Sequence, residues 1–337
     1  MPRRLLRLGA LAFAAMAFSL APCAIASPAG ETAPPADPVA DTTAGSAVAD
    51  PVVNPIAHVE QRGVGPINMV LIPGSPSDWR VWDAFMTRNA ERYTMYALTL
   101  AGFSGTPAMP MPDADTTSPT PWMDAEVDAI AQFIADRKLK DVVVVGHSLG
   151  GHLVLRLAIE HPDAAAKIID VDGVPASNYG GADLTPEMRV AFIDSQLAPQ
   201  LKSMDKQKAA AMFEGSAHQM VTDPKRGDEL AAMFAATDQA IAMEYLLQGL
   251  KSDISNKMKD IKTPTLVIAS VGQAKDNEAA REKIRTQWKN WTASVDAITL
   301  EFYEDSMHFV MDDQPKKLDE SIENFLGVAA KPEQEQQ

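Results

Sequence analysis

Ser148 lies in the sequence Gly-His-Ser-Leu-Gly at residues 146–150, whose pattern is typical of a serine that acts as a nucleophile. The β-branched residues 142–145 predict a buried strand before it, and Leu149 and Leu153 begin a helical apolar pattern after it. A strand, a tight turn and a helix in this order lift a hydroxyl group above the edge of a sheet, and glycine is needed where strand and helix approach. Ser148 is therefore a candidate nucleophile, the alternative being a serine that only caps the helix.

This chemistry has further requirements. A serine hydroxyl is a weak nucleophile, so Ser148 needs a base to accept its proton and a carboxylate to orient that base. The N–H group of Leu149, at the start of the predicted helix, is a candidate donor to the negative oxygen that forms during attack. The six histidines are scattered, no His-Glu-x-x-His sequence occurs, and residues 102–105 lack the spacing of a dinucleotide-binding loop. We therefore expect no metal and no other cofactor.

Alternating strand and helix patterns are expected to position these groups. Besides the strand before Ser148, the sequence predicts strands at 67–72, 93–99, 168–173, 264–269 and 297–303, and helices at 79–87, at 123–139 and from residue 314. This alternation indicates an α/β fold with a mostly parallel sheet and helices on both faces. Active sites in such folds lie beyond the carboxyl ends of the strands, where Ser148 and the loops 73–75 and 102–105 would gather.

Residues 56–327 resemble the α/β-hydrolase family. The resemblance rests on Gly-His-Ser-Leu-Gly-Gly at 146–151, Leu-Ile-Pro-Gly-Ser-Pro at 71–76, Ala-Gly-Phe-Ser-Gly at 101–105 and Met-His-Phe at 307–309. Pro73 departs from the family, which often has histidine at that position, but that histidine is not a member of the catalytic triad. A serine in the turn argues against the branches with an aspartate nucleophile, the epoxide hydrolases and haloalkane dehalogenases.

The resemblance implies roles for further residues. His308 would be the base, because the family's histidine follows the last strand, precedes the C-terminal helix and comes after the nucleophile in the chain. Two residues compete as the orienting acid: Asp172, at the end of the strand after the helix of Ser148, and Asp276, in the loop after residue 269. We prefer Asp172. The second donor to the negative oxygen would be the N–H group of Ser75, although a simple turn is the alternative there.

About ninety residues of helical pattern separate the strand at 168–173 from the strand at 264–269. Similar proteins carry a helical lid inserted at this point, so we expect a lid at about residues 174–260. The segment is rich in methionine and aromatic residues. Most of them are expected to pack in the core, but a pocket lined by methionine would suit an adaptable apolar substrate.

The two ends of the chain differ in composition from the middle. Three arginines, an uncharged stretch at 8–20 and Ala-Ile-Ala at 24–26 predict a signal peptide over residues 1–26, whose apolar core is too short to span a bilayer. The single cysteine, Cys23, lies within it, so we expect no disulfide. Residues 27–55 predict a disordered Ala- and Pro-rich linker, residues 56–328 the hydrolase domain and residues 329–337 a polar tail. We therefore expect an exported protein, periplasmic or secreted.

The charge of the chain bears on its partners. The net charge of the 337 residues is −15, and it becomes −18 once the three arginines of the predicted signal peptide are removed. Such a surface repels nucleic acid and anionic membranes, so the expected partner is a small-molecule substrate. The sequence leaves the oligomeric state open.

These observations favour a serine hydrolase that cleaves an ester of a small to medium apolar substrate through an acyl-enzyme on Ser148. The same residues could serve a peptidase, a thioesterase or a carbon–carbon bond hydrolase, because a fold does not determine a substrate. A third hypothesis is a non-catalytic ligand-binding protein that keeps the hydrolase scaffold, and the irregular loop around Asp276 is what motivates it.

Overall fold

The computed structural model describes residues 53–113, 116–177, 184–274 and 277–328. The predicted signal peptide, most of the predicted linker, the predicted polar tail and the alternative acid Asp276 lie outside these ranges. Within the described ranges, no helix has the length and apolar character needed to cross a membrane.

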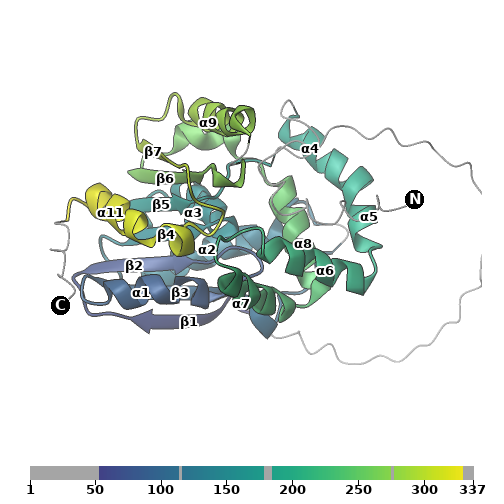
Figure 1. Ribbon diagram of the computed structural model, residues 1–337, viewed down its shortest axis with the longest axis horizontal. Helices are drawn as coiled ribbons and strands as arrows, with labels where there is room; N and C mark the ends of the chain where they lie inside the picture. Colours follow the sequence, from purple (N-terminus) through teal and green to yellow (C-terminus); the bar gives the residue numbers. More distant parts are fainter. Residues whose placement is uncertain (1–52, 114–115, 178–183, 275–276, 329–337) are drawn as a thin grey trace, which may run out of the picture.

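Seven strands form one sheet in the order β1-β3-β2-β4-β5-β6-β7 (Figure 1). They are β1 (Ile56–Arg62), β2 (Ile67–Ile72), β3 (Tyr93–Leu100), β4 (Val143–His147), β5 (Lys167–Val171), β6 (Thr265–Ser270) and β7 (Ile298–Tyr303). Five neighbouring pairs are parallel, and β1 runs antiparallel to β3. The prediction of a mostly parallel sheet is confirmed. The edge strand β1 was not predicted, because its polar residues, from Glu60 to Arg62, do not follow the pattern of a buried strand.

Helices cover both faces of the sheet. Side chains alternate along β4, so that Val143 and Val145 join one apolar cluster while Val144 joins the other. Helices α1 (Asp83–Asn89) and α11 (Pro315–Leu326) pack in the first cluster, and α2 (Pro121–Asp136), α3 (Leu149–Glu160) and α9 (Glu278–Thr292) pack in the second (Figure 1). The predicted α/β architecture with helices on both faces is therefore confirmed.

A helical segment is inserted between β5 and β6, as predicted. Its described part contains α4 (Pro186–Phe192), α5 (Ala198–Lys202), α6 (Lys206–Ala217), α7 (Pro224–Ala235) and α8 (Gln239–Lys251), which gather beyond one end of the sheet (Figure 1). Four of these helices begin with a capping side chain that accepts a hydrogen bond from their first turn, namely Thr185, Asp205, Asp223 and Asp238. We call residues 184–260 the lid.

The methionines of the lid belong mainly to the core. Met212, Met220, Met233 and Met243 are each less than a tenth exposed, and they pack in the same cluster as α1, α11 and one face of the sheet. The lid and the sheet therefore share a continuous apolar core, and these methionines stabilise the fold.

Candidate active site

Ser148 forms the turn between β4 and α3. Its backbone has φ 56° and ψ −116°, a conformation that side chains of L-residues disfavour. Its N–H group donates to the carbonyl of Val171 at the end of β5, and its own carbonyl accepts from the N–H group of His152, each at 3.0 Å. Hydrogen bonds on both sides therefore hold the candidate nucleophile in this strained turn.

Glycines allow three segments to meet at Ser148. A Cβ atom on Gly146 would lie 2.0 Å from the carbonyl oxygen of Gly150, and one on Gly150 would lie 2.5 Å from the carbonyl oxygen of Ile72 in β2. A Cβ atom on Gly74 would lie 2.7 Å from the Cβ atom of Ser148. Any side chain at these positions would push strand, helix and loop apart, which is why the sequence has glycine there.

Asp172 and His308 meet at the same end of the sheet. Asp172 follows β5 and His308 follows β7, and Oδ2 of Asp172 lies 2.6 Å from Nδ1 of His308. The side chains are 13% and 16% exposed. A carboxylate oxygen can only accept, so Nδ1 of His308 carries the hydrogen and Nε2 is left to accept a proton from another group.

His147 connects the nucleophile's turn to the segment of His308. The ring of His147 is fully buried, its Nε2 lies 3.0 Å from the carbonyl oxygen of His308, and the two ring centres are 4.6 Å apart. Burial, together with the charge that His308 can carry, holds the pKa of His147 well below its ordinary value. His147 is therefore neutral and donates through Nε2 to the backbone of His308. Sequence reasoning missed this contact because the two residues are 161 positions apart.

Asp170 is a second residue that sequence reasoning missed. It is fully buried, and its Oδ1 accepts the N–H group of Gly173 at 2.8 Å. This bond closes the turn in which Asp172 has a φ of 54°. Burial raises the pKa of Asp170 well above its ordinary value. The negative charge of Asp172 raises this pKa further, and the hydrogen bond from Gly173 lowers it. Asp170 shapes the backbone that aims Asp172, and the Asp-x-x-Gly spacing is the signal that could have indicated it.

Ser75 lies in the loop after β2, beside the turn of Ser148. The neighbouring Gly74 is in close contact with Ser148, as described above. Ser77 closes the loop, because its N–H group and its hydroxyl both donate to the carbonyl of Gly74, at 2.9 and 2.7 Å. The structure thus brings both residues with predicted donor amides, Ser75 and Leu149, next to Ser148.

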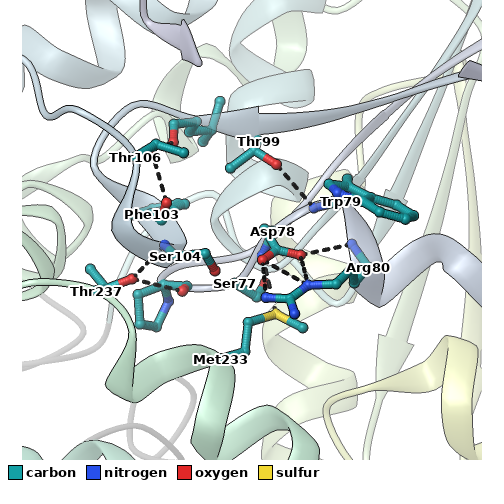
Figure 2. A network of polar contacts seen from close by, with 12 residues as sticks. Ser77, Asp78, Trp79, Arg80, Thr99, Phe103, Ser104, Thr106, Met233 and Thr237 are labelled. Atoms are coloured by element: carbon teal, nitrogen blue, oxygen red, sulfur yellow. Dashed lines mark hydrogen bonds and ion pairs between the residues drawn. The ribbon is translucent and has the colours of Figure 1, made fainter. Parts of the chain in front are cut away.

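The lid holds this loop and the loop after β3, as Figure 2 shows. The Thr237 hydroxyl donates to the carbonyl of Pro76 at 3.3 Å and accepts the N–H group of Ser104 at 2.8 Å. The sulfur of Met233 accepts the N–H group of Asp78 at 3.3 Å. Two loops that follow separate strands are therefore fixed to each other through the lid.

An ion pair stabilises the far end of the loop after β2. The side chain of Asp78 is 5% exposed and lies 2.6 Å from the guanidinium of Arg80 (Figure 2). Burial raises the pKa of Asp78, but the bonds and charge of Arg80 outweigh this effect and hold the pKa below its ordinary value. Asp78 is therefore charged and begins the helical turn at Trp79 by accepting the N–H group of Arg80.

The geometry assembles five predicted residues at one end of the sheet, namely Ser148, Leu149, Ser75 and the hydrogen-bonded pair Asp172 and His308. The alternative acid Asp276 lies outside the described residues. Among the described residues, no group of three or more His, Cys, Asp or Glu side chains could hold a metal ion. The arrangement thus combines a serine in a strained turn with an imidazole that a carboxylate orients, at the same end of the sheet.

Comparison with known proteins gives related hydrolases. A pimeloyl-[acyl-carrier protein] methyl ester esterase from Aeromonas hydrophila is 27% identical over 162 residues, which are 48% of this chain and 59% of that protein. A 2-(acetamidomethylene)succinate hydrolase from Mesorhizobium japonicum is 24% identical over 212 residues, 63% of this chain and 72% of that protein. The match to the esterase thus covers about three fifths of its length.

Solved structures share the fold. A hydrolase from Pseudomonas aeruginosa superposes with a TM-score of 0.60 at 19% identity, covering 80% of this chain and 94% of that one. An esterase from Exiguobacterium antarcticum superposes with a TM-score of 0.62 at 17% identity, covering 80% and 95%. Residues 69–320, most of the described structure, match the model of the alpha/beta hydrolase family. The chain therefore belongs to the alpha/beta hydrolase family.

Proposed function

We propose that this protein is a serine hydrolase that cleaves an ester of a small to medium apolar substrate through an acyl-enzyme on Ser148. The observation that carries the proposal is the 2.6 Å hydrogen bond of Asp172 to His308, on a segment that also contacts the turn of Ser148 through His147. The relatives described above include a methyl ester esterase, which supports an ester among the bonds that such a site can cleave.

The first half of the reaction forms the acyl-enzyme. Oγ of Ser148 attacks the ester carbonyl while Nε2 of His308 accepts the hydroxyl proton, and Asp172 stabilises the resulting imidazolium. The carbonyl oxygen becomes negative and accepts hydrogen bonds from the N–H groups of Leu149 and Ser75. The tetrahedral intermediate then expels the alcohol, which takes the proton from His308.

The second half releases the acid. Water takes the place of the alcohol and attacks the acyl carbon while Nε2 of His308 accepts its proton. The same two amides stabilise the second negative oxygen. His308 then returns the proton to Oγ of Ser148 as the acyl–oxygen bond breaks, so the enzyme is regenerated.

The apolar character of the substrate is inferred from the lid. Trp79 in the loop after β2, and Phe192 and Met204 in the lid, are partly buried and pack against the cluster that joins lid and sheet. Sites for small apolar ligands are usually lined by apolar and aromatic side chains with a few fixed polar groups, and we infer an apolar substrate from side chains of this kind.

The proposal is tested with p-nitrophenyl esters of increasing acyl length and with a fluorophosphonate probe, which labels activated serines. The purified protein should hydrolyse the short and medium esters and be labelled on Ser148. Ser148→Ala should lose labelling and at least about 10³-fold in turnover while keeping its circular dichroism spectrum. Ester hydrolysis that survives Ser148→Ala, or a native protein that is neither labelled nor active, would contradict the proposal.

We also propose that the protein is exported, on the basis of its first 26 residues. Mass spectrometry of the protein recovered from its producing cell should then give an N-terminus at Ser27. An intact Met1 or Pro2 at the N-terminus would contradict export by this route.

A further inference from the structure

The segment that carries His308 is held by hydrogen bonds to its backbone from two sides. The N–H group of Met307 donates to Oδ2 of Asp313 at 2.7 Å. On the other side, the carbonyl of His308 accepts the bond from His147 that was described above. The position of the imidazole therefore depends on the side chains of Asp313 and His147, which bind the backbone on either side of it.

A third hydrogen bond comes from the lid. The N–H group of Phe309 donates to the carbonyl of Met220, in the stretch between α6 and α7, at 2.9 Å. Two residues further along the lid, the N–H group of Thr222 donates to Oδ1 of Asp313 at 2.8 Å. The carboxylate of Asp313 thus binds one backbone amide beside His308 and one in the lid, with one oxygen for each.

An ion pair reinforces the same junction. Nε of Arg226, in the first turn of α7, lies 3.0 Å from Oδ2 of Asp312, and the two side chains are 19% and 12% exposed. Asp312 and Asp313 are neighbours in the short helix α10 (Val310–Asp313), which directly follows the segment of His308. Two adjacent carboxylates therefore connect the lid segment 220–226 to the segment 307–309.

We propose that Asp313 is a positioning residue that couples the lid to His308. This inference rests on the proposed function, in which His308 is the base. A carboxylate that accepts two amide hydrogens makes two charge-assisted bonds, so its removal leaves both amides unpaired. The two segments then stay joined by the bond of Phe309 to Met220 and by the ion pair of Arg226 with Asp312, and each is held less firmly. A general base must be placed to within a fraction of an ångström, and a displacement of about 1 Å can cost about a hundredfold in rate.

The test compares Asp313→Ala and Asp313→Asn with a matched control, Asp319→Asn. The amide of Asn has one accepting oxygen and can keep only one of the two bonds. Asp319 in α11 likewise accepts several donors, from Arg88 and Asn89, but does not contact the segment of His308. We expect Asp313→Ala to lower kcat about 10- to 100-fold, with KM changed less than about threefold. The kcat of Asp313→Asn should lie between that of Asp313→Ala and that of the native protein. Asp319→Asn should leave kcat unchanged.

Hydrogen exchange of the native chain and the variants gives a readout that does not need turnover. In Asp313→Ala, the amides of the peptides covering 219–223 and 305–309 should exchange faster together, while Asp319→Asn should leave both unchanged. Faster exchange in only one of the two segments, or a kcat within twofold of the native value in Asp313→Ala, would overturn the coupling. If the native protein cleaves no ester, the proposed function fails, and joint exchange of the two segments alone decides whether Asp313 couples them.

Discussion

Asp172 and His308 meet across an intervening strand. Asp172 follows β5, His308 follows β7, and β6 runs between these strands in the sheet. Oδ2 of Asp172 binds His308, while Oδ1 accepts the N–H group of Ser270 at the end of β6, at 2.7 Å. The bond from β6 thus holds the carboxylate of Asp172 in the orientation in which its other oxygen binds the imidazole. The order of β5, β6 and β7 in the sheet therefore determines how Asp172 and His308 meet.

Replacing Asp172 tests its role against that of the competing acid. In Asp172→Asn, the side-chain amide would donate to Nδ1 and force the ring hydrogen onto Nε2, where the proton from Ser148 must go. We expect kcat to fall by about 10⁴-fold in an ester assay. Asp276→Asn serves as the control and should keep native activity. Loss of activity in Asp276→Asn with retention in Asp172→Asn would assign the acid to the other loop.

The neutral His147 predicts the pH dependence of catalysis. Because the pKa of His147 lies well below its ordinary value of 6.5, this ring stays neutral at the pH where an ordinary histidine takes up its second proton, although it contacts His308. His147 therefore adds no ionisation to catalysis, and a plot of log(kcat/KM) against pH should rise with a slope of one on its acid limb. His147→Gln should keep that slope. A slope of two in the native protein would contradict the neutral state of His147.

A buried carboxyl connects the lid to the core. The hydroxyl of Tyr245 in α8 lies 2.9 Å from the carbonyl oxygen of Ala101 and 2.5 Å from Oε1 of Glu126 in α2. A phenol has one hydrogen and a carbonyl only accepts, so both bonds coexist when Glu126 is protonated and donates to Tyr245. Burial raises the pKa of Glu126 to about 8, against the opposing effects of Tyr245 and Arg156. The contact between lid and core therefore depends on one proton.

This proton predicts a loss of stability with rising pH. Between the ordinary pKa of 4.5 and about 8, folded protein keeps the proton on Glu126 and unfolded protein does not. The free energy of unfolding therefore falls as pH rises, by up to about 1.4 kcal/mol per pH unit, and the effect ends above pH 8. Above pH 7, the buried His147 and His152 are neutral in both states and add nothing. Urea unfolding at pH 7, 7.5 and 8 should show this decline, and Glu126→Gln should make it less steep, although Asp170, whose pKa burial also raises, still contributes a decline of the same sign. An equal decline in the variant would assign it to other groups.

The glycines of the turn predict a contrast between two Gly→Ala substitutions. In Gly146→Ala, the new Cβ atom would meet the carbonyl oxygen of Gly150 at 2.0 Å, so the strand and helix must separate at a cost of at least about 3 kcal/mol. Gly215 lies within α6 and has no atom within 4 Å of a built Cβ. Gly215→Ala should therefore raise the unfolding free energy by about 1 kcal/mol. Denaturant unfolding of both variants checks this, and similar values for the two would refute the explanation.

The sequence was sufficient to predict the parallel strands and the turn of Ser148, for a physical reason. The central strand at β4 is buried on both sides, so its residues form an uninterrupted apolar run that ends at a glycine. The edge strand β1 escaped prediction because pairing with β3 on one side only leaves its polar residues in contact with water. A strand that is buried on both faces can be recognised from its continuous apolar run, and an edge strand lacks such a run.

The residues that support the candidate site were harder to predict than the site itself. Asp313 and Met220 reach the segment of His308 from positions that are close only in the folded chain, and no periodicity connects them. The sequence favoured Asp172 over Asp276 only slightly, because each follows a predicted strand whose carboxyl end reaches the same edge of the sheet. The contact of Asp172 with the imidazole of His308 depends on the positions of β5 and β7 in the sheet, which the sequence does not state.

The backbone conformation of Ser148 has a consequence for stability. Ser148→Ala keeps a Cβ atom and hence the strain at φ 56°, whereas Ser148→Gly removes it. Relief of about 1–3 kcal/mol should at least balance the extra chain entropy of glycine, so Ser148→Gly should unfold at a temperature no lower than Ser148→Ala. A glycine variant that is less stable by 1 kcal/mol or more would contradict this.

A glycine at position 148 would thus release backbone strain that any residue with a Cβ atom keeps at this φ. The proposed role of Ser148 as nucleophile gives a reason for a residue with a Cβ atom in this turn, where the backbone alone would favour glycine.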